Sequence, residues 1–326
     1  MVLVALAGCR EISIPPPGSY SEILLVTEDG RQSVFLPLIM QNIGRELDYY
    51  TGQEKQFEVS VIRAEQLEAF PKMKNIVMVG IVDELTSIGQ EIGMLIGEDG
   101  VRKVAGGEAT ILKRENMPAP GQMTLIVTAR SRAELEAVLR ERGDELPGII
   151  EASARKRLRR YLSTLLDKDL VQYLYRTYGF TIEIPSLYRL QSESKNPPGI
   201  ELIREPPTRS LGIFWDDWKR EPTLADSLAL FKMRSDYVFE RYNGDVMDST
   251  RVAFSWAQVG PYRAIEMAGY WSNINATVGG AYRTYFIFEE SEQLLWAIDN
   301  LVFAPGRSKH PHFRELLALT ETFRYD

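Results

Sequence analysis

The sequence contains few of the residues that most often build catalytic and metal-binding sites. Its single cysteine, Cys9, excludes a disulfide within the chain and any zinc site made of several thiolates. Its two histidines, His310 and His312, flank Pro311, and no further histidine or cysteine lies close in sequence. A GxSxG motif is absent as well, which argues against a Ser-His-Asp hydrolase. We therefore predict no metal site, no cofactor and no assigned catalytic residue.

Two further absences limit the classes of function. No stretch reaches the ~18 consecutive apolar residues that a transmembrane helix needs. The net charge is −7, whereas nucleic-acid binding depends on a basic surface that displaces counterions from phosphates, so no nucleic-acid partner is expected. The glycine-rich stretch 96–108 fits neither a Walker loop nor a GxGxxG motif after a strand, and nucleotide binding is not indicated.

The amino terminus carries a pattern that is typical of lipid-anchored bacterial proteins. Residues 1–9, MVLVALAGC, are apolar and end in Leu6-Ala7-Gly8-Cys9. Small residues before a cysteine resemble the lipobox of bacterial lipoproteins, in which the peptide is cut before the cysteine and the thiol carries a diacylglycerol. The segment departs from that pattern because it lacks a basic start and its apolar core is shorter than the usual ~7–15 residues. A buried amino-terminal strand with a chance cysteine is the alternative.

The residues after Cys9 indicate a tether. Pro15, Pro16 and Pro17 favour an extended polyproline conformation, which would separate a lipid from a folded body. We interpret residues 1–21 as a lipobox-like signal remnant and a proline-rich tether. The expected location is the bacterial cell envelope, periplasmic or outer-membrane associated, with the membrane contacted through a lipid on Cys9.

The first part of the folded chain, residues 22–147, alternates strands and helices. The continuous apolar run at 75–82, NIVMVGIV, predicts a central strand. Ser131 and Glu134 have the spacing of a capping box at the start of a helix. The other expected elements are strands at 22–28, 57–61, 108–113 and 123–128, and helices at 33–50 and 87–104.

The second part, residues 148–326, is predicted to begin with a long helix at 151–178 that ends at Gly179. The best-patterned stretch is 262–307, in which alternating strands give way to a helical period after Ser291. The residues that share this helical face are Leu294, Leu295, Ile298, Leu301 and Val302. The other expected elements are strands at 180–184 and 210–215, and helices at 222–242 and 313–323.

The order of the expected elements is the same in both parts: helix, strand, strand, helix, strand, strand, helix. We therefore predict an α+β fold of two similar halves, each a mainly antiparallel sheet with packed helices, and infer an internal duplication. Two unrelated α+β halves are the alternative, because the spacings between elements differ. The period is too long for a solenoid.

Several stretches of the chain together resemble one known family. They are KNIVMVGIVD from Lys74, YGFTIEIPSLYRL from Tyr178, LGIFWDDW from Leu211, ATVGGAYRTYF from Ala276 and LWAIDNLVFAPGRSK from Leu295. On these motifs the chain resembles the bacterial lipoprotein-like domain-of-unknown-function 4837 family, over nearly everything after the tether. The resemblance implies a lipoprotein-type signal and an envelope location. It implies no reaction and no catalytic residues.

The first candidate binding site is the segment Trp215-Asp216-Asp217-Trp218, at the end of an expected buried strand. Adjacent carboxylates could bind a cation or act as acid and base, and the tryptophans could stack on a sugar or peptide ring. Neighbouring residues of a strand point to opposite faces, however, unless a turn intervenes. The alternative is that the aspartates simply begin the loop before Pro222.

The second candidate binding site comprises Trp271, Asn273, Gly279 and Gly280. Glycines beside asparagines are typical of loops in which the backbone closely approaches a ligand. The alternative is a hairpin turn, because glycine and asparagine both accept positive φ.

We expect a binding or interaction module with an unknown protein or glycan partner. The alternative is a hydrolase or glycan-active enzyme that uses Asp216, Asp217 or Glu266, which would need two carboxylates ~5–10 Å apart in a cleft. A third interpretation buries all the tryptophans as core. The partner would meet an aromatic face, since such residues give a large contact area at low entropic cost; its residues are Trp215, Trp218, Trp256, Tyr270 and Trp271.

Overall fold

The computed structural model describes residues 19–49, 52–71, 73–82, 85–108, 110–242 and 244–325. The predicted lipidation site at Cys9 and the prolines of the tether lie outside these residues. In the part of the chain that is described, no helix combines the length and the hydropathy needed to span a bilayer.

The chain divides into two compact units. The first unit takes in the described residues of 19–45 and 57–154, and the second unit those of 46–56 and 155–325. The predicted boundary between residues 147 and 148 stays a prediction, because compactness alone does not show that either part folds by itself. The first unit contains β1 (Glu22–Thr27), η1 (Gly30–Gln32), α1 (Leu36–Ile43), β4 (Glu58–Arg63), η2 (Ala64–Ala69), β5 (Asn75–Ile81), α2 (Ser87–Ala105), β6 (Ile111–Glu115), β7 (Met123–Ala129), α3 (Arg132–Arg142) and the start of α4 (Glu145–Ser163).

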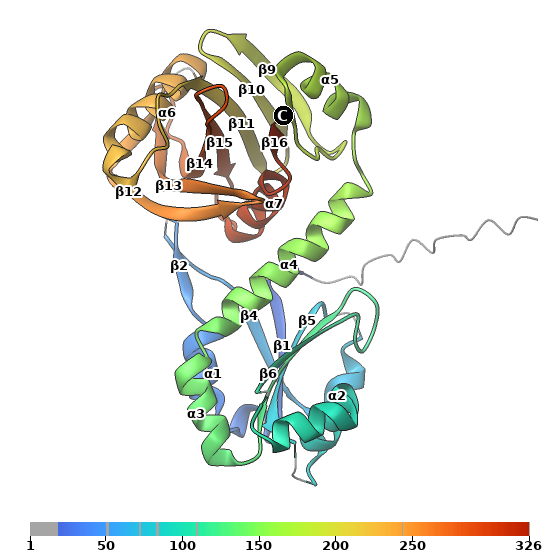
Figure 1. Cartoon of the computed structure of the whole chain (residues 1–326). Coiled ribbons are helices and arrows are strands. Elements are labelled where there is room, and N and C mark those ends of the chain that lie inside the picture. The colour runs from blue at the N-terminus through green and yellow to red at the C-terminus, as the bar shows by residue number, and fades with distance from the viewer. Residues whose placement is uncertain are drawn as a thin grey trace, which may run out of the picture. The chain divides into compact units, whose positions relative to one another are not determined.

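The sheet of the first unit, which lies between α1 and α3 on one side and α2 on the other in Figure 1, has the strand order β4-β1-β5-β7-β6. Its strands pair in parallel except for β6, which runs antiparallel to β7. Parallel neighbours require long crossovers, and here helices supply them. Helices α1, α3 and the start of α4 pack on one face of the sheet, while α2 packs on the other.

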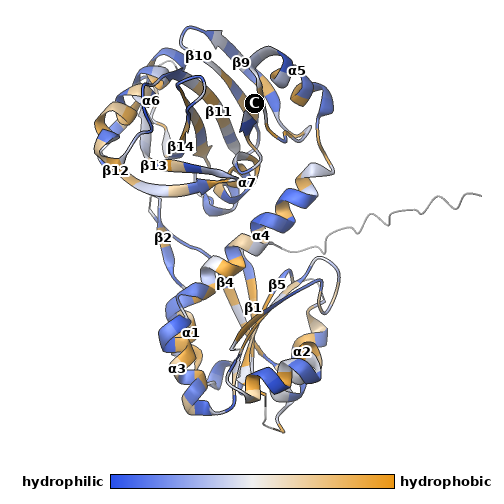
Figure 2. Cartoon of the chain, viewed as in Figure 1, coloured by the Kyte–Doolittle hydropathy of each residue, from blue (hydrophilic) through white to orange (hydrophobic). Residues whose placement is uncertain are grey.

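Burial on both faces explains the apolar run of β5. All seven residues of this strand are buried, and β5 lies in the middle of the sheet, so the predicted central strand at 75–82 is confirmed. Figure 2 shows the complementary pattern in the helices, since α3 and α4 alternate hydrophilic and hydrophobic residues along their length. Ser131 accepts a hydrogen bond from the Glu134 N–H at 3.3 Å and caps α3 as predicted.

The second unit is organised around a sheet of longer strands. Its elements are β2 (Glu46–Asp48), β3 (Gln53–Lys55), the end of α4, α5 (Lys168–Tyr178), β8 (Phe180–Thr181), β9 (Arg189–Lys195), β10 (Pro198–Arg204), β11 (Thr208–Asp217), η3 (Leu224–Asp226), α6 (Ser227–Arg241), β12 (Asp245–Val259), β13 (Tyr262–Asn273), β14 (Gly279–Glu289), β15 (Leu294–Phe303), α7 (His310–Thr320) and β16 (Arg324–Tyr325).

Seven of these strands form one antiparallel sheet, in the order β12-β13-β14-β15-β11-β10-β9. One face of this sheet packs against α5, α7 and the small β8–β16 ribbon. The other face packs against α6. Both faces are therefore occupied by apolar side chains, and the strands between them carry apolar residues at successive positions.

This double burial overturns the helix that the sequence predicts after Ser291. Residues 294–303 form strand β15 in the interior of the sheet. Trp296 and Ile298 face α7, whereas Leu295 and Ala297 face α6. A strand that is buried on both sides has no polar alternation, and its apolar positions then match a helical period by coincidence.

The predicted helix at 33–50 ends early because its last residues are drawn into a ribbon of the second unit. The Glu54 carboxylate accepts hydrogen bonds from the Lys309 N–H at 2.6 Å and from the Lys309 ammonium at 2.9 Å. The Tyr49 ring stacks on Phe313 with 5.3 Å between centroids, and its hydroxyl lies 2.5 Å from Nδ1 of His310. These contacts hold the β2–β3 ribbon against the start of α7, and helix α1 stops at Ile43.

The predicted long helix at 151–178 is divided into α4 and α5. Between them Asp167 donates its N–H to the Ile184 carbonyl at 2.8 Å, and its carboxylate accepts from the Leu170 N–H at 3.0 Å. The side chain thus caps a new helix. Gly179 ends α5 with a φ of 76°, as predicted, because glycine accepts the left-handed conformation without steric cost.

The α+β class is confirmed, with strands in several sheets and helices packed on them. Antiparallel pairing prevails in the second unit, but the first sheet is parallel at three of its four strand pairs. The predicted likeness of the two halves, and the duplication inferred from it, are therefore not seen in the strand pairing. The same order of helices and strands in sequence is compatible with both sheets, since it does not specify which strands become neighbours.

Candidate functional site

The predicted segment Trp215–Trp218 lies at the end of β11, and the structure does not gather its side chains into one site. Trp215 packs into the core between Trp296, at 5.0 Å between ring centroids, and Tyr178, at 5.6 Å. Asp216 and Asp217 are exposed neighbours in a strand, so their carboxylates point to opposite faces.

Trp218 has a positional role at the end of the same segment. Its ring is half-buried against the core beneath α6, and its backbone N–H donates to the Gln293 carbonyl at 2.7 Å. This bond ties the start of the β11–α6 loop to the turn between β14 and β15. The residues that follow, beginning with Lys219, are thereby placed beside that turn.

The second predicted site forms the β13–β14 hairpin. Trp271 pairs with Gly280 and is buried, with an exposed fraction of 6%. A Cβ at Gly280 would lie 2.7 Å from Nε1 of Trp271, so the glycine makes room for the indole. Asn273 donates to the Asp245 carboxylate at 2.6 Å, and its side-chain oxygen accepts from the Asn275 N–H at 2.8 Å. These bonds fix the hairpin loop.

The structure separates Glu266 from the aspartates of β11. Glu266 pairs with Arg283 at 3.1 Å, and Arg283 in turn lies over the rings of Tyr49 and Phe313 on the face that packs against α7. Two strands lie between β13 and β11, which sets their backbones about 14 Å apart. The described residues therefore do not bring Glu266 together with Asp216 or Asp217 as an acid–base pair.

The histidines are engaged in packing contacts. His310 lies between the Tyr49 hydroxyl and the Arg314 guanidinium, at 2.5 and 2.9 Å from its two ring nitrogens. Burial, with the positive charge of Arg209 nearby, lowers the pKa of His312 to about 4. No group of three or more His, Cys, Asp or Glu side chains within the described ranges is arranged to hold a metal ion.

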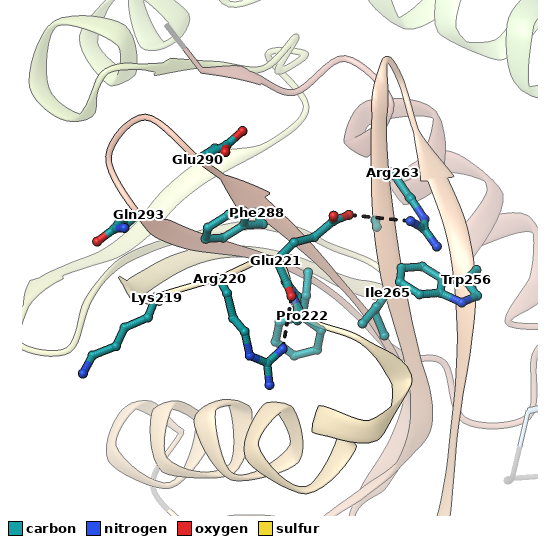
Figure 3. Close-up of a pocket in the computed structure, with 12 residues that line it drawn as sticks. Lys219, Arg220, Glu221, Pro222, Trp256, Arg263, Ile265, Phe288, Glu290 and Gln293 are labelled. Atoms are coloured by element: carbon teal, nitrogen blue, oxygen red, sulfur yellow. Dashed lines mark hydrogen bonds and ion pairs between the residues drawn. The ribbon is translucent and has the colours of Figure 1, made fainter.

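A pocket of about 420 Å³ opens on the α6 face of the large sheet (Figure 3). The β11–α6 loop forms one side, and strands β12 to β14 with the turn after β14 form the rest. Its apolar surface comprises Pro222, Trp256, Ile265, Phe286 and Phe288. Its rim comprises Lys219, Arg220, Glu221, Arg263, Glu290 and Gln293.

Strand register places an exposed tryptophan on the wall of this pocket. Trp256 lies opposite Ile265 in the β12–β13 pair, and Arg263 stands two residues before Ile265, so all three side chains share one face. The Arg263 guanidinium lies 3.6 Å from the centroid of the indole. Trp256 nevertheless keeps 42% of its surface exposed. This cation–π contact fixes the orientation of the ring and leaves much of it open.

The loop on the opposite side of the pocket is fixed by a charged clamp. The Arg220 guanidinium donates two hydrogen bonds to the Asp226 carboxylate, at 2.6 and 2.9 Å. The same carboxylate accepts from the Thr223 N–H at 2.8 Å. The bonds from Arg220, and next the bond from the Thr223 N–H, lower the pKa of Asp226 to about 2. The loop therefore presents its side chains from a defined backbone.

One ion pair spans the pocket from the loop to the sheet. Glu221 lies 3.8 Å from Arg263, and both side chains are more than half exposed, at 58% and 60%. Exposed pairs of this kind contribute at most about 1 kcal/mol. The two groups can thus exchange their mutual contact for contacts with a bound molecule at little cost.

Of the predicted aromatic face, the structure places only Trp256 in this pocket. Trp215 and Trp271 belong to the core, and Tyr270 lies elsewhere on β13 beneath the Arg251 guanidinium. The rim residues of the β11–α6 loop and Arg263 were not predicted. The sequence contains a feature from which the place of Arg263 could be predicted, namely the turn at Gly260. This turn sets the register of β12 and β13, and in that register Arg263 lies diagonally opposite Trp256.

Comparisons with known proteins place part of the chain in a described family. Residues 167–322 match the profile of the family described as "Domain of unknown function (DUF4837)". No curated protein matches the chain. The matched residues lie within the second unit, which contains the pocket.

Two solved structures share a partial likeness with the chain. One is the crystal structure of LpqN, involved in cell envelope biogenesis of Mycobacterium tuberculosis, at 13% identity and a TM-score of 0.29, over 44% of this chain and 81% of that one. The other comes from Bacteroides thetaiotaomicron, at 9% identity and a TM-score of 0.28, over 45% of each chain. The family match thus covers residues 167–322, just under half of the chain, and the family is one of unknown function.

Proposed function

We propose that the protein is a lipid-anchored protein of the bacterial cell envelope that binds a ligand in the pocket beside Trp256. The observation that carries the binding proposal is the indole of Trp256, which is 42% exposed and held in place by Arg263 at 3.6 Å. An aromatic ring that is both fixed and open can contact a ligand without losing much conformational entropy.

The surroundings of Trp256 support binding over catalysis. The carboxylates proposed for an enzyme, on β11 and at Glu266, lie on separate strands, and Glu266 is paired with Arg283. The pocket instead offers an apolar floor and a rim of both charges, which suits recognition of a partly polar molecule. Its two sides are fixed by the Arg220–Asp226 clamp and by strand pairing, so the site is preformed.

The envelope location is supported by the sequence. Leu6-Ala7-Gly8-Cys9 resembles a lipobox, and the prolines that follow favour an extended tether. A lipid on Cys9 would keep the pocket close to a membrane surface. The test is the intact mass of the protein after membrane extraction. We expect a diacylglycerol on Cys9 and cleavage before it, and an unmodified chain that still carries Met1 contradicts the anchor.

Binding is tested separately from anchoring by using the Cys9→Ser chain. In this background, the protein with the native pocket and its Trp256→Ala variant are compared in a sedimentation assay. The assay measures the fraction of each protein that is retained on detergent-washed bacterial envelopes. We expect Trp256→Ala to lose most of the retained fraction. Phe239→Ala is the matched control, because Phe239 is a 64% exposed aromatic residue on α6 outside the pocket lining. Equal retention of all three proteins would contradict the proposed site.

A further inference from the structure

We propose that the ligand of this pocket is a saccharide, whose ring stacks on Trp256 and whose hydroxyl groups bond to the rim. This inference rests on the proposed binding function and names its ligand class. The pocket volume of about 420 Å³ lies within the range of sites for small molecules and short oligomers.

The polar groups of the rim are of the chemical types that form hydrogen bonds to adjacent hydroxyl groups. Arg220 and Arg263 carry planar guanidinium groups with several N–H donors, and Glu221 and Glu290 carry carboxylates with two acceptor oxygens. Gln293 adds one carboxamide, which offers both a donor and an acceptor. Planar groups of this kind form paired hydrogen bonds to neighbouring oxygen atoms, as in bidentate recognition of carboxylates.

The apolar surface includes the exposed indole of Trp256, which suits the C–H face of a sugar ring. Trp256 presents its indole, and Pro222 and Phe288 lie nearby in the pocket (Figure 3). Aromatic rings with one apolar surface and a polar surrounding favour ligands that are themselves amphipathic. An acyl chain fits this site poorly, because the floor is small and the rim that surrounds it is charged.

Two of the rim groups, Glu221 and Arg263, are available to a ligand because the ion pair between them is weak. Glu221 and Arg263 touch only at 3.8 Å and are more than half exposed. Arg220, in contrast, spends two donors on Asp226 and is held in position by them. A saccharide would meet one fixed cation and one ion pair that it can replace.

A peptide is the competing occupant. Strand β12 lies at the edge of the seven-stranded sheet, so an extended peptide could pair with it. Peptide anchors, however, favour deep apolar pockets that remove an aromatic or aliphatic side chain from water. In this pocket the apolar surface is surrounded by exposed charged side chains, and this arrangement favours a saccharide over a peptide side chain.

The experiment titrates the Cys9→Ser chain with cellotetraose, N-acetylglucosamine tetramer and tetragalacturonate, followed by calorimetry. We expect at least one of them to bind, with affinity reduced tenfold or more by Trp256→Ala and less by Trp256→Phe, which keeps a ring. Arg263→Gln should weaken binding several-fold, and Phe239→Ala should leave it unchanged. Near-ultraviolet circular dichroism checks that each variant keeps its fold.

The outcomes separate the ligand class from the binding function. Failure of all three saccharides to bind at concentrations up to about 10 mM, or equal binding by Trp256→Ala, overturns the saccharide proposal. If retention on washed envelopes still depends on Trp256 in that case, the pocket binds a different class, and a peptide is then favoured. If that retention is also insensitive to Trp256, the proposed function falls as well.

Discussion

The two large sheets differ in how completely helices cover them. In the first unit, β5 and β7 have seven residues each, about 23 Å, while α2 has 19 residues with a kink at Gly97. In the second unit, β12 and β13 have 15 and 12 residues, about 50 and 40 Å, while α6 has 15 residues, about 22 Å. The second sheet is longer than the helix on its face, and the pocket occupies part of the remaining surface.

The same comparison extends to buried charge. Among the described residues, every buried arginine, aspartate and glutamate belongs to the second unit. Arg234 of α6 donates two hydrogen bonds to Asp299 of β15, at 2.8 and 2.9 Å, with both side chains buried. Thr284 also donates to Asp299 at 2.7 Å. Among its described residues the first unit packs its helices on the sheet without a buried ion pair, whereas the second unit holds α6 by apolar contact and a buried ion pair.

The largest effect is expected from removing one partner of that ion pair. Asp299→Ala leaves the fully buried Arg234 without its opposite charge, and we expect a loss of about 3–5 kcal/mol in the stability of the second unit. All five tryptophans lie in this unit, so urea unfolding followed by tryptophan fluorescence reports on it. The double variant Arg234→Met with Asp299→Leu should recover most of the loss. A loss below about 1 kcal/mol for Asp299→Ala would contradict the role of the pair.

Truncating a core side chain of the first unit should lower the free energy of unfolding by a somewhat smaller amount. Leu125 of β7 is fully buried, and Leu125→Ala should lose about 2–5 kcal/mol through lost apolar contacts and a residual cavity. Because the first unit has no tryptophan, the measurement is amide hydrogen exchange of β5 and β7. Leu85→Ala is the control, since Leu85 is 96% exposed and should leave stability unchanged. Unchanged exchange protection in Leu125→Ala would show that this face is not a packed core.

The ribbon on α7 should give a smaller effect that depends on pH. Burial alone would raise the pKa of Glu54, but hydrogen bonds from the side chain and backbone of Lys309 and from Ser308 lower it overall. The stabilisation is therefore complete above the unfolded value of 4.5 and is lost as pH falls through the lower folded value. Glu54→Gln should lose about 1–2 kcal/mol at pH 7 and remove this acid dependence. Glu46→Gln, at an exposed position of the same ribbon, should do neither.

The effect that is smallest at pH 7 concerns His312, because its protonation differs between the folded and unfolded chain only at lower pH. Its folded pKa of about 4 lies below the usual 6.5, so the unfolded chain binds a proton at a higher pH than the folded chain does. The stability of the second unit should accordingly decrease as pH falls from about 6.5 towards 4. His312→Gln should flatten this slope in fluorescence-monitored unfolding between pH 7 and pH 5. An identical slope in the variant would contradict the assignment.

The sequence predicts those parts of the fold that depend on local chemistry. The strand at 75–82, the cap at Ser131 and the stop at Gly179 each follow from nearby residues, and the structure confirms them. Strand β15 could not be distinguished from a helix, because double burial removes the polar alternation. The β2–β3 ribbon was missed since its contacts, such as Glu54 with Lys309, join residues more than 250 positions apart.

The candidate site was only partly predictable for the same reason. Trp256 was expected on an aromatic face, but four tryptophans or tyrosines grouped with it lie in the core or elsewhere on the sheet. Whether a tryptophan is core or surface depends on which strands become neighbours and how far α6 extends. Neither property follows from the local pattern around Trp215 or Trp271.

The most direct test of the account is the ratio of envelope-bound to free protein for the Cys9→Ser chain with and without Trp256→Ala, measured by sedimentation at equal concentration. The account predicts that the chain with Trp256 sediments with washed envelopes and that the alanine variant stays largely in solution while keeping its unfolding midpoint. Equal ratios for the two proteins would contradict a binding site at this pocket.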